Sequence, residues 1–129
     1  MKFISYKHNS EPKFGIIDNN LITDLTGKIS GADTLKDLIF KNGISEAKTY
    51  ASENPGNISV DDIEYLPLIP NPGKIICVGL NYSEHVKETN RTVEENPVIF
   101  HRFPESQTAH MQPIQRPIAS DNLDFEGEM

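Results

Sequence analysis

The sequence predicts an α+β fold that is mostly β, with a small N-terminal β-meander and its helices over residues 1–70 and the start of a second, incomplete domain over residues 71–129. Three observations predict this fold. Short segments rich in β-branched and aromatic residues open the chain, apolar residues then recur with helical spacing, and a proline-rich connector precedes a continuous apolar run.

Three short strands are predicted near the N-terminus, over residues 3–6, 14–17 and 21–23. Each is rich in the residues that favour strands. Residues 18–20, Asp-Asn-Asn, separate the last two strands and have the composition of a tight turn. Short strands joined by short turns indicate an antiparallel meander.

A helix is predicted between Asp33, its N-cap, and Gly43, which stands just beyond its C-terminal end. The apolar positions that carry its buried face are Leu35, Leu38 and Ile39. A second helix is predicted to start after Ser45 and to run to Ala51, because the Asn-Pro-Gly-Asn sequence at 54–57 breaks helices.

The connector at residues 66–73 contains three prolines, which exclude a central strand or a helix interior. The apolar run at 74–79 that follows predicts a strand buried on both faces. A short helix over 83–89 and a strand over 97–100 come next. Residues 102–122 show no periodicity and are predicted to form a long loop.

Composition excludes several classes of protein. The net charge of −7 argues against a nucleic-acid partner, which would require a basic surface. The N-terminus lacks the apolar core of a signal peptide, and no stretch approaches the ~20 apolar residues of a membrane span. Cys77 is the single cysteine and lies in an apolar run, so we expect a buried, inert thiol and a cytoplasmic protein without a membrane partner.

Acidic residues alternate with others at the C-terminal end, at Asp124, Glu126 and Glu128. In an extended strand they would point to one side at intervals of about 6.5–7 Å. Clustered carboxylates suit a hard divalent cation such as Mg²⁺, Mn²⁺ or Ca²⁺. The alternative is a solvated acidic strand face that binds nothing.

His85 and Glu88 stand three residues apart on the helix predicted at 83–89, so they would share one face. A carboxylate beside an imidazole fixes its tautomer and raises its basicity, which suits a general base. The alternative is an ordinary contact on a helix surface.

Four segments in order resemble the fumarylacetoacetate hydrolase family. They are the run at 74–82 that ends in Gly-Leu-Asn-Tyr, then His85, then Pro-Val-Ile-Phe at 97–100, and then Asp-Phe-Glu-Gly-Glu at 124–128. The resemblance spans residues 74–129, and residues 1–72 are more loosely similar to the small N-terminal domain of bacterial members. It implies that the second domain begins the mixed β-sandwich roll of this family.

The resemblance also implies roles for individual residues. Glu126 and Glu128 match the two glutamates that bind a divalent metal, most often Mg²⁺ and sometimes Mn²⁺ or Ca²⁺. His85 matches the catalytic histidine and Glu88 the acid that partners it. Arg102 stands where members place loop groups near the substrate, and its alternative is a solvated or structural arginine.

The family acts on 2-oxo or 1,3-dicarbonyl acids as hydrolases, decarboxylases or isomerases that share a metal-bound enolate. The resemblance therefore implies a metal-dependent enzyme for a small acidic oxo acid, as a homodimer in its full-length form. Members usually add an aspartate ligand further along the chain, which the 129 residues lack. The alternative expectation is a catalytically inactive fragment, or a structural or binding module of the same family.

Overall fold

The computed structural model describes residues 1–80 and 96–123. The described residues divide into two compact units. The first takes in residues 1–72 and 107–114, and the second takes in 73–80, 96–106 and 115–123. That the second unit begins a larger catalytic domain stays a prediction.

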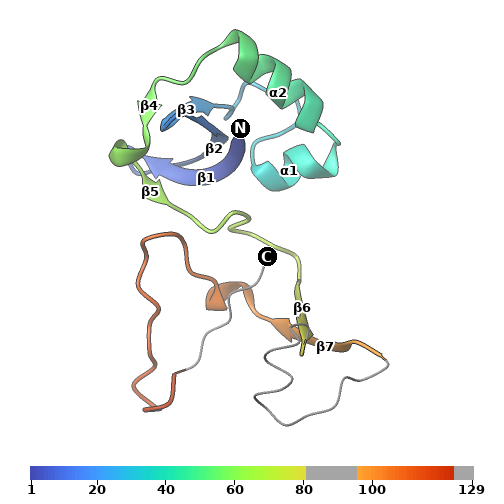
Figure 1. The fold of residues 1–129 in the computed structure, drawn as a ribbon, viewed down its shortest axis with the longest axis vertical. Coiled ribbons are helices and arrows are strands. Elements are labelled where there is room, and N and C mark those ends of the chain that lie inside the picture. The colour runs from blue at the N-terminus through green and yellow to red at the C-terminus, as the bar shows by residue number, and fades with distance from the viewer. Residues whose placement is uncertain (81–95, 124–129) are drawn as a thin grey trace. The chain divides into compact units, whose positions relative to one another are not determined.

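A five-stranded antiparallel sheet forms the centre of the first unit (Figure 1). In the order in which they lie side by side, its strands are β4 (Ile58–Ser59), β3 (Leu21–Asp24), β2 (Glu11–Asp18), β1 (Lys2–His8) and β5 (Glu64–Tyr65). The three long strands are the meander that the sequence predicts. The short edge strands β4 and β5, and the 3-10 turn Val60–Asp62 between them, have no clear sequence signal.

Two-residue turns fix the register of the meander. Asn9 and Ser10 link β1 to β2 with φ of 52° and 67°, and Asn19 and Asn20 link β2 to β3 with φ of 49° and 65°. Positive φ at both central positions gives a turn whose twist matches the flanking strands, and asparagine tolerates this conformation. The turn predicted at residues 18–20 is therefore confirmed.

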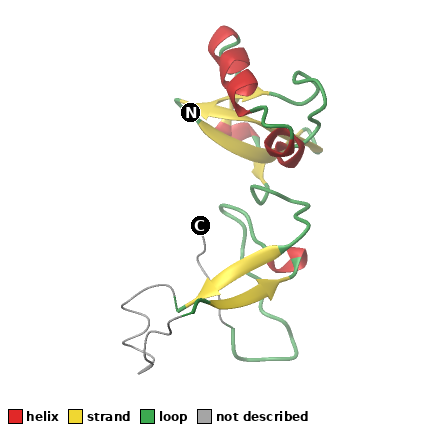
Figure 2. Cartoon of the chain, turned by 90° about the vertical axis from the view of Figure 1, so that its right-hand side faces the viewer, coloured by secondary structure: helices red, strands yellow, loops and turns green. Residues whose placement is uncertain are grey.

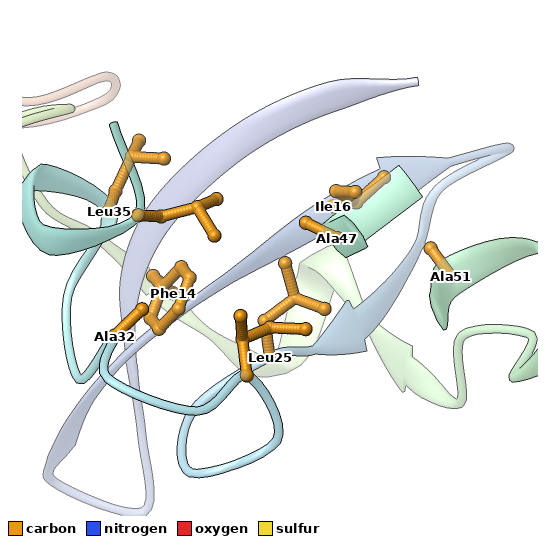
Figure 3. Close-up of a cluster of buried hydrophobic side chains, with 9 residues drawn as sticks. Phe14, Ile16, Leu25, Ala32, Leu35, Ala47 and Ala51 are labelled. Carbon is orange, nitrogen blue, oxygen red and sulfur yellow. The ribbon is translucent and has the colours of Figure 1, made fainter. Parts of the chain in front are cut away.

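Both faces of the sheet are covered, and side chains alternate between them with a period of two. Phe14 and Ile16 point to the face covered by the helices, where they pack with Leu25, Leu35 and other buried residues (Figure 3). The opposite face carries a smaller cluster of Ile4, Tyr6 and Ile22. This arrangement buries consecutive residues in the middle of β1 and β2.

The first helix, α1 (Leu35–Phe40), begins one residue later than predicted, so the assignment of Asp33 as its N-cap is wrong. Thr34 is the N-cap: its Oγ1 accepts from the Asp37 N–H at 3.2 Å, and the Asp37 carboxylate accepts from the Thr34 N–H at 3.0 Å. This reciprocal capping requires an acceptor three residues after the cap. Asp33 would have Lys36 there, which has no acceptor.

The second helix, α2 (Ile44–Glu53), starts before Ser45 because Gly43 is its N-cap. Gly43 has a φ of −81°, and its carbonyl accepts from the Ala47 N–H at 3.0 Å. The left-handed residue that ends α1 is Asn42, with a φ of 58°, so the placement of Gly43 as the terminator of α1 is wrong. Ala47 and Ala51 lie one turn apart on the buried face.

The second unit contains an antiparallel ribbon of β6 (Ile75–Gly79) and β7 (Val98–Arg102), followed by the 3-10 turn Pro104–Ser106 (Figure 2). The rest of the described part of residues 102–122 lacks strands and longer helices, as the sequence predicts. Cys77 is buried, as expected. The expectation that its strand is buried on both faces is wrong, because Ile76 and Ile99 on the other face are 64% and 57% exposed.

Candidate active site

The residues predicted to act in catalysis and metal binding lie in two segments of the chain, 81–95 and 124–129. His85 and Glu88 lie within 81–95, and Glu126 and Glu128 lie within 124–129, outside the described residues. Their roles and their mutual approach therefore stay predictions. The described residues define the frame from which the first of these segments departs.

That frame is the ribbon of β6 and β7. Its register fixes the two strand ends that are connected by residues 81–95, which contain His85 and are called the histidine segment below. Gly79 pairs with Val98 at one end of the ribbon, and the segment with His85 connects these two strand ends. A Cβ added to Gly79 would lie 3.3 Å from the Val98 Cγ1, which is a tight contact. Glycine at this position allows the two strands to approach each other closely where Gly79 pairs with Val98.

Leu80 follows Gly79 and has a φ of 56°, in the left-handed region. This conformation costs a branched side chain roughly 1–2 kcal/mol, because its Cβ crowds the following carbonyl. Strained residues of this kind concentrate at turns that hold functional groups. The strained residue, Leu80, therefore belongs to the Gly-Leu-Asn-Tyr motif and follows directly after the end of β6.

Arg102 is the one predicted site residue within the described part of the chain. It pairs with Ile75 at the end of the ribbon opposite to Gly79 and Val98. It lies four steps along the strand from Val98, a distance of about 13 Å. Its guanidinium carbon lies 5.6 Å from the centre of the Phe100 ring, which is a cation–π contact. A role in substrate binding stays a prediction.

Two histidines among the described residues, His101 and His110, make aromatic contacts. His101 meets the Phe103 ring edge to face with centroids 5.6 Å apart, and His110 meets Tyr65 in the same way at 4.9 Å. Within residues 1–80 and 96–123, no three His, Cys, Asp or Glu side chains are grouped as a metal would require. Over those same residues, no helix is long and apolar enough to cross a bilayer.

The first unit contains an ion pair that no sequence motif predicted. The Lys13 ammonium donates to the Asp24 Oδ2 at 2.7 Å, and the Thr26 N–H donates to the Asp24 Oδ1 at 2.9 Å. Burial alone would raise the pKa of Asp24, but these hydrogen bonds and the charge of Lys13 outweigh it and lower the pKa. Only the pairing of β2 with β3 brings the two residues together.

Tyr6 lies near this ion pair, because it faces Lys13 across the β1–β2 ladder. Its side chain is fully buried, and its hydroxyl lies close to the Asp24 carboxylate but makes no hydrogen bond of ordinary geometry with the described residues. Burial, and then the nearby charge of Asp24, raise the pKa of this hydroxyl well above its ordinary value. The group therefore stays neutral, and it bears on stability more than on chemistry.

Comparison with known proteins identifies the class to which this fold and these motifs belong. The family described as "Fumarylacetoacetate (FAA) hydrolase C-terminal" matches residues 74–129. The matched range contains the ribbon and both segments that carry the predicted catalytic and metal-binding residues. Residues 74–129 of the chain therefore belong to the fumarylacetoacetate hydrolase family.

Particular relatives agree with this assignment. The chain is 36% identical over 69% of its length to a Xenopus laevis protein named oxaloacetate tautomerase fahd2, mitochondrial, and this match covers 28% of that protein. Over its whole length it is 29% identical to an uncharacterised protein of Staphylococcus aureus strain USA300, covering 50% of it. The chain thus spans half or less of the length of these relatives.

A solved structure supports the fold. A crystal structure described as an HpcE protein from Mycobacterium smegmatis superposes with a TM-score of 0.65 at 20% identity. The match covers 88% of this chain and 40% of that one. The predicted fold class, α+β and mostly β, is confirmed by this likeness and by the described residues, which form two α-helices and are otherwise mostly β.

Proposed function

We propose that the protein is a metal-dependent enzyme of the fumarylacetoacetate hydrolase family, acting on a small 2-oxo or 1,3-dicarbonyl acid. The observation that carries the proposal is the family match over residues 74–129, which contains every residue expected at the site. Among the reactions of the family we favour keto–enol tautomerisation. The Xenopus laevis relative and a Rattus norvegicus relative are both named as oxaloacetate tautomerases.

The donor set fits a hard divalent ion. Glu126 and Glu128 would hold it, since carboxylate oxygens are the ligands that Mg²⁺ and Mn²⁺ prefer. When bound, the ion supplies Lewis acidity to the oxygens of a chelating oxo acid. The described residues provide no further group of three potential ligands.

His85 moves the proton in the proposed reaction. In tautomerisation to the enol a proton leaves the carbon next to the carbonyl group and one is added to oxygen, and decay of the enol is the reverse, so no atoms are gained or lost. His85 would take that proton, with Glu88 holding the imidazole in the required tautomer. Arg102 would pair with a substrate carboxylate, because a guanidinium forms strong hydrogen bonds with carboxylates.

The test measures decay of the oxaloacetate enol by ultraviolet absorbance, with the 129-residue chain, with and without Mg²⁺ or Mn²⁺. The double substitution Glu126→Gln and Glu128→Gln should abolish the metal-dependent rate. His85→Gln should lower it by roughly 10²–10⁴-fold, the usual contribution of a general base. Glu105→Gln, on an exposed residue after β7, is the matched control and should change nothing. Full activity of the double variant would refute the proposal.

A non-catalytic module of the same family is the second candidate. The observation that favours it is that the matches cover only 28% and 50% of the two relatives. A chain that shows no turnover, and whose melting temperature does not respond to Mg²⁺ or Mn²⁺, would support this candidate against the enzyme. The expected homodimer is also a proposal, and light scattering on the purified chain would test it.

A further inference from the structure

A pocket of about 290 Å³ lies in the first unit, and none of the residues that line it is assigned to the proposed active site. Three segments line it: residues 2–5 of β1, residues 65–68 around the end of β5, and residues 108–110. Ile17 of β2 completes the lining. All of these residues belong to the same compact unit, so a single unit supplies the whole lining of the pocket.

The pocket exists because β5 follows β1 for only a short distance. The strands pair at Tyr6 and Lys7, and the Leu66 N–H still donates to the Ser5 carbonyl at 3.0 Å. Pro67 has no N–H to continue the ladder, so the chain leaves the edge of β1. The Ser5 hydroxyl donates to the Leu68 carbonyl at 2.7 Å and holds the departing chain as a wall.

The segment at residues 108–110 forms the other wall, and two contacts hold it in place. The His110 ring stands edge to face on Tyr65, with centroids 4.9 Å apart and planes at 87°. Just before it, the Gln107 side chain donates to the Ile69 carbonyl at 3.4 Å. The pocket is therefore bounded by chain segments tied to one another and to the edge of the sheet.

The lining combines an apolar interior with positive charge. Ile4, Ile17 and Leu66 supply aliphatic surface, and none of the lining residues is acidic, although the chain carries 19 Asp and Glu against 12 Lys and Arg. Lys2 lines the pocket and remains exposed, so an anion that pairs with it stays partly hydrated. This combination favours an apolar anion over a cation or a highly polar solute.

We propose that this pocket is a binding site for a small aromatic carboxylate, with the ring against Ile4, Ile17 and Tyr65 and the carboxylate directed toward Lys2. An apolar cavity of about 150 Å³ holds benzene, so this volume accepts one ring with a short substituent. The Tyr65 and His110 rings offer the edge and face contacts that aromatic ligands prefer. The proposal goes beyond the proposed function and does not depend on it.

The test is a titration of the ¹⁵N-labelled 129-residue chain with sodium benzoate, followed by two-dimensional NMR. Amide shifts are expected within residues 2–5, 65–68 and 108–110. Benzamide has the same shape without the charge and should bind about threefold more weakly, the size of a partly exposed ion pair. Sodium phosphate at equal ionic strength should shift none of these amides, because it lacks an apolar group.

Variants separate the pocket from non-specific charge effects. Lys2→Gln should remove the preference for benzoate over benzamide, whereas Lys28→Gln, the same change on an exposed lysine outside the pocket, should preserve it. Ala109→Phe should fill the space and abolish binding of both ligands. Shifts confined to other residues, equal affinity for benzoate and benzamide, or equal behaviour of the two lysine variants would each overturn the proposal.

Discussion

Gly15, in the middle of β2, is a position where the smallest possible substitution should strongly destabilise the first unit. A Cβ added there would lie 2.4 Å from the Thr23 carbonyl oxygen and 3.0 Å from the Ile22 Cγ2. Real Cβ atoms essentially never approach closer than 3.0 Å, so the backbones of β2 and β3 must separate by at least 0.6 Å, the difference between 2.4 and 3.0 Å. Gly15→Ala therefore forces apart two strands that pair directly at this residue.

The magnitude follows from what has to move. Overpacking of a core costs about 1–3 kcal/mol, and the upper end applies here because the obstructing atom belongs to the backbone. A loss of about 3 kcal/mol corresponds to a fall in melting temperature of roughly 12–24 °C for a unit of this size. Urea and thermal unfolding followed by far-UV circular dichroism would measure it, since the chain has no tryptophan.

Gly73→Ala is the matched control, because it makes the same chemical change with nothing within 4 Å of the added Cβ. It should leave stability unchanged or raise it by about 0.4–1 kcal/mol, through reduced freedom of the unfolded chain. If the two variants differ in unfolding free energy by less than about 1 kcal/mol, the packing argument at Gly15 is wrong.

Two further predictions concern the Lys13–Asp24 ion pair and the nearby Tyr6 hydroxyl. Because the pKa of Asp24 is lowered below its ordinary 3.8, its ion pair with Lys13 stabilises the fold above that pH and is lost as pH falls through the folded-state pKa. The stability deficit of Asp24→Asn should therefore shrink between pH 6 and pH 3 in urea titrations. Tyr6→Phe removes a buried hydroxyl without a hydrogen-bond partner among the described residues, so it should be neutral or stabilise by about 1 kcal/mol. A loss above 1 kcal/mol in the same assay would show that this hydroxyl is satisfied.

Local chemistry made much of the first unit predictable. The strands of the meander, the Asn19–Asn20 turn and the burial of Leu35 and Leu38 depend on neighbours in sequence and were predicted. The Asn9–Ser10 turn was not predicted, and Ile39, expected on the buried face of α1, is 51% exposed. The errors fall at helix ends. Whether Asp33 or Thr34 caps α1 depends on which one has an acceptor three residues later, and that acceptor is Asp37.

The strand at β6 shows where sequence pattern misleads. A continuous apolar run is the signature of a strand covered on both sides, yet within the described residues Ile76 stays exposed. Apolar character does not reveal how many layers of structure cover a strand. The pairing of Cys77 with Phe100, and the position of Arg102 at the opposite end of the ribbon from Gly79 and Val98, come from the register of the ribbon.

The sequence by itself determined the family and the candidate chemistry, because motifs such as Gly-Leu-Asn-Tyr and the alternating acids need only short-range order to be recognised. Tertiary structure alone decided the Lys13–Asp24 ion pair and the pocket between β1 and residues 108–110. Both join residues brought together by strand pairing or by the return of a distant loop. Such contacts arise because the burial of apolar surface folds the chain back on itself. The spacing of the residues along the sequence does not predict them.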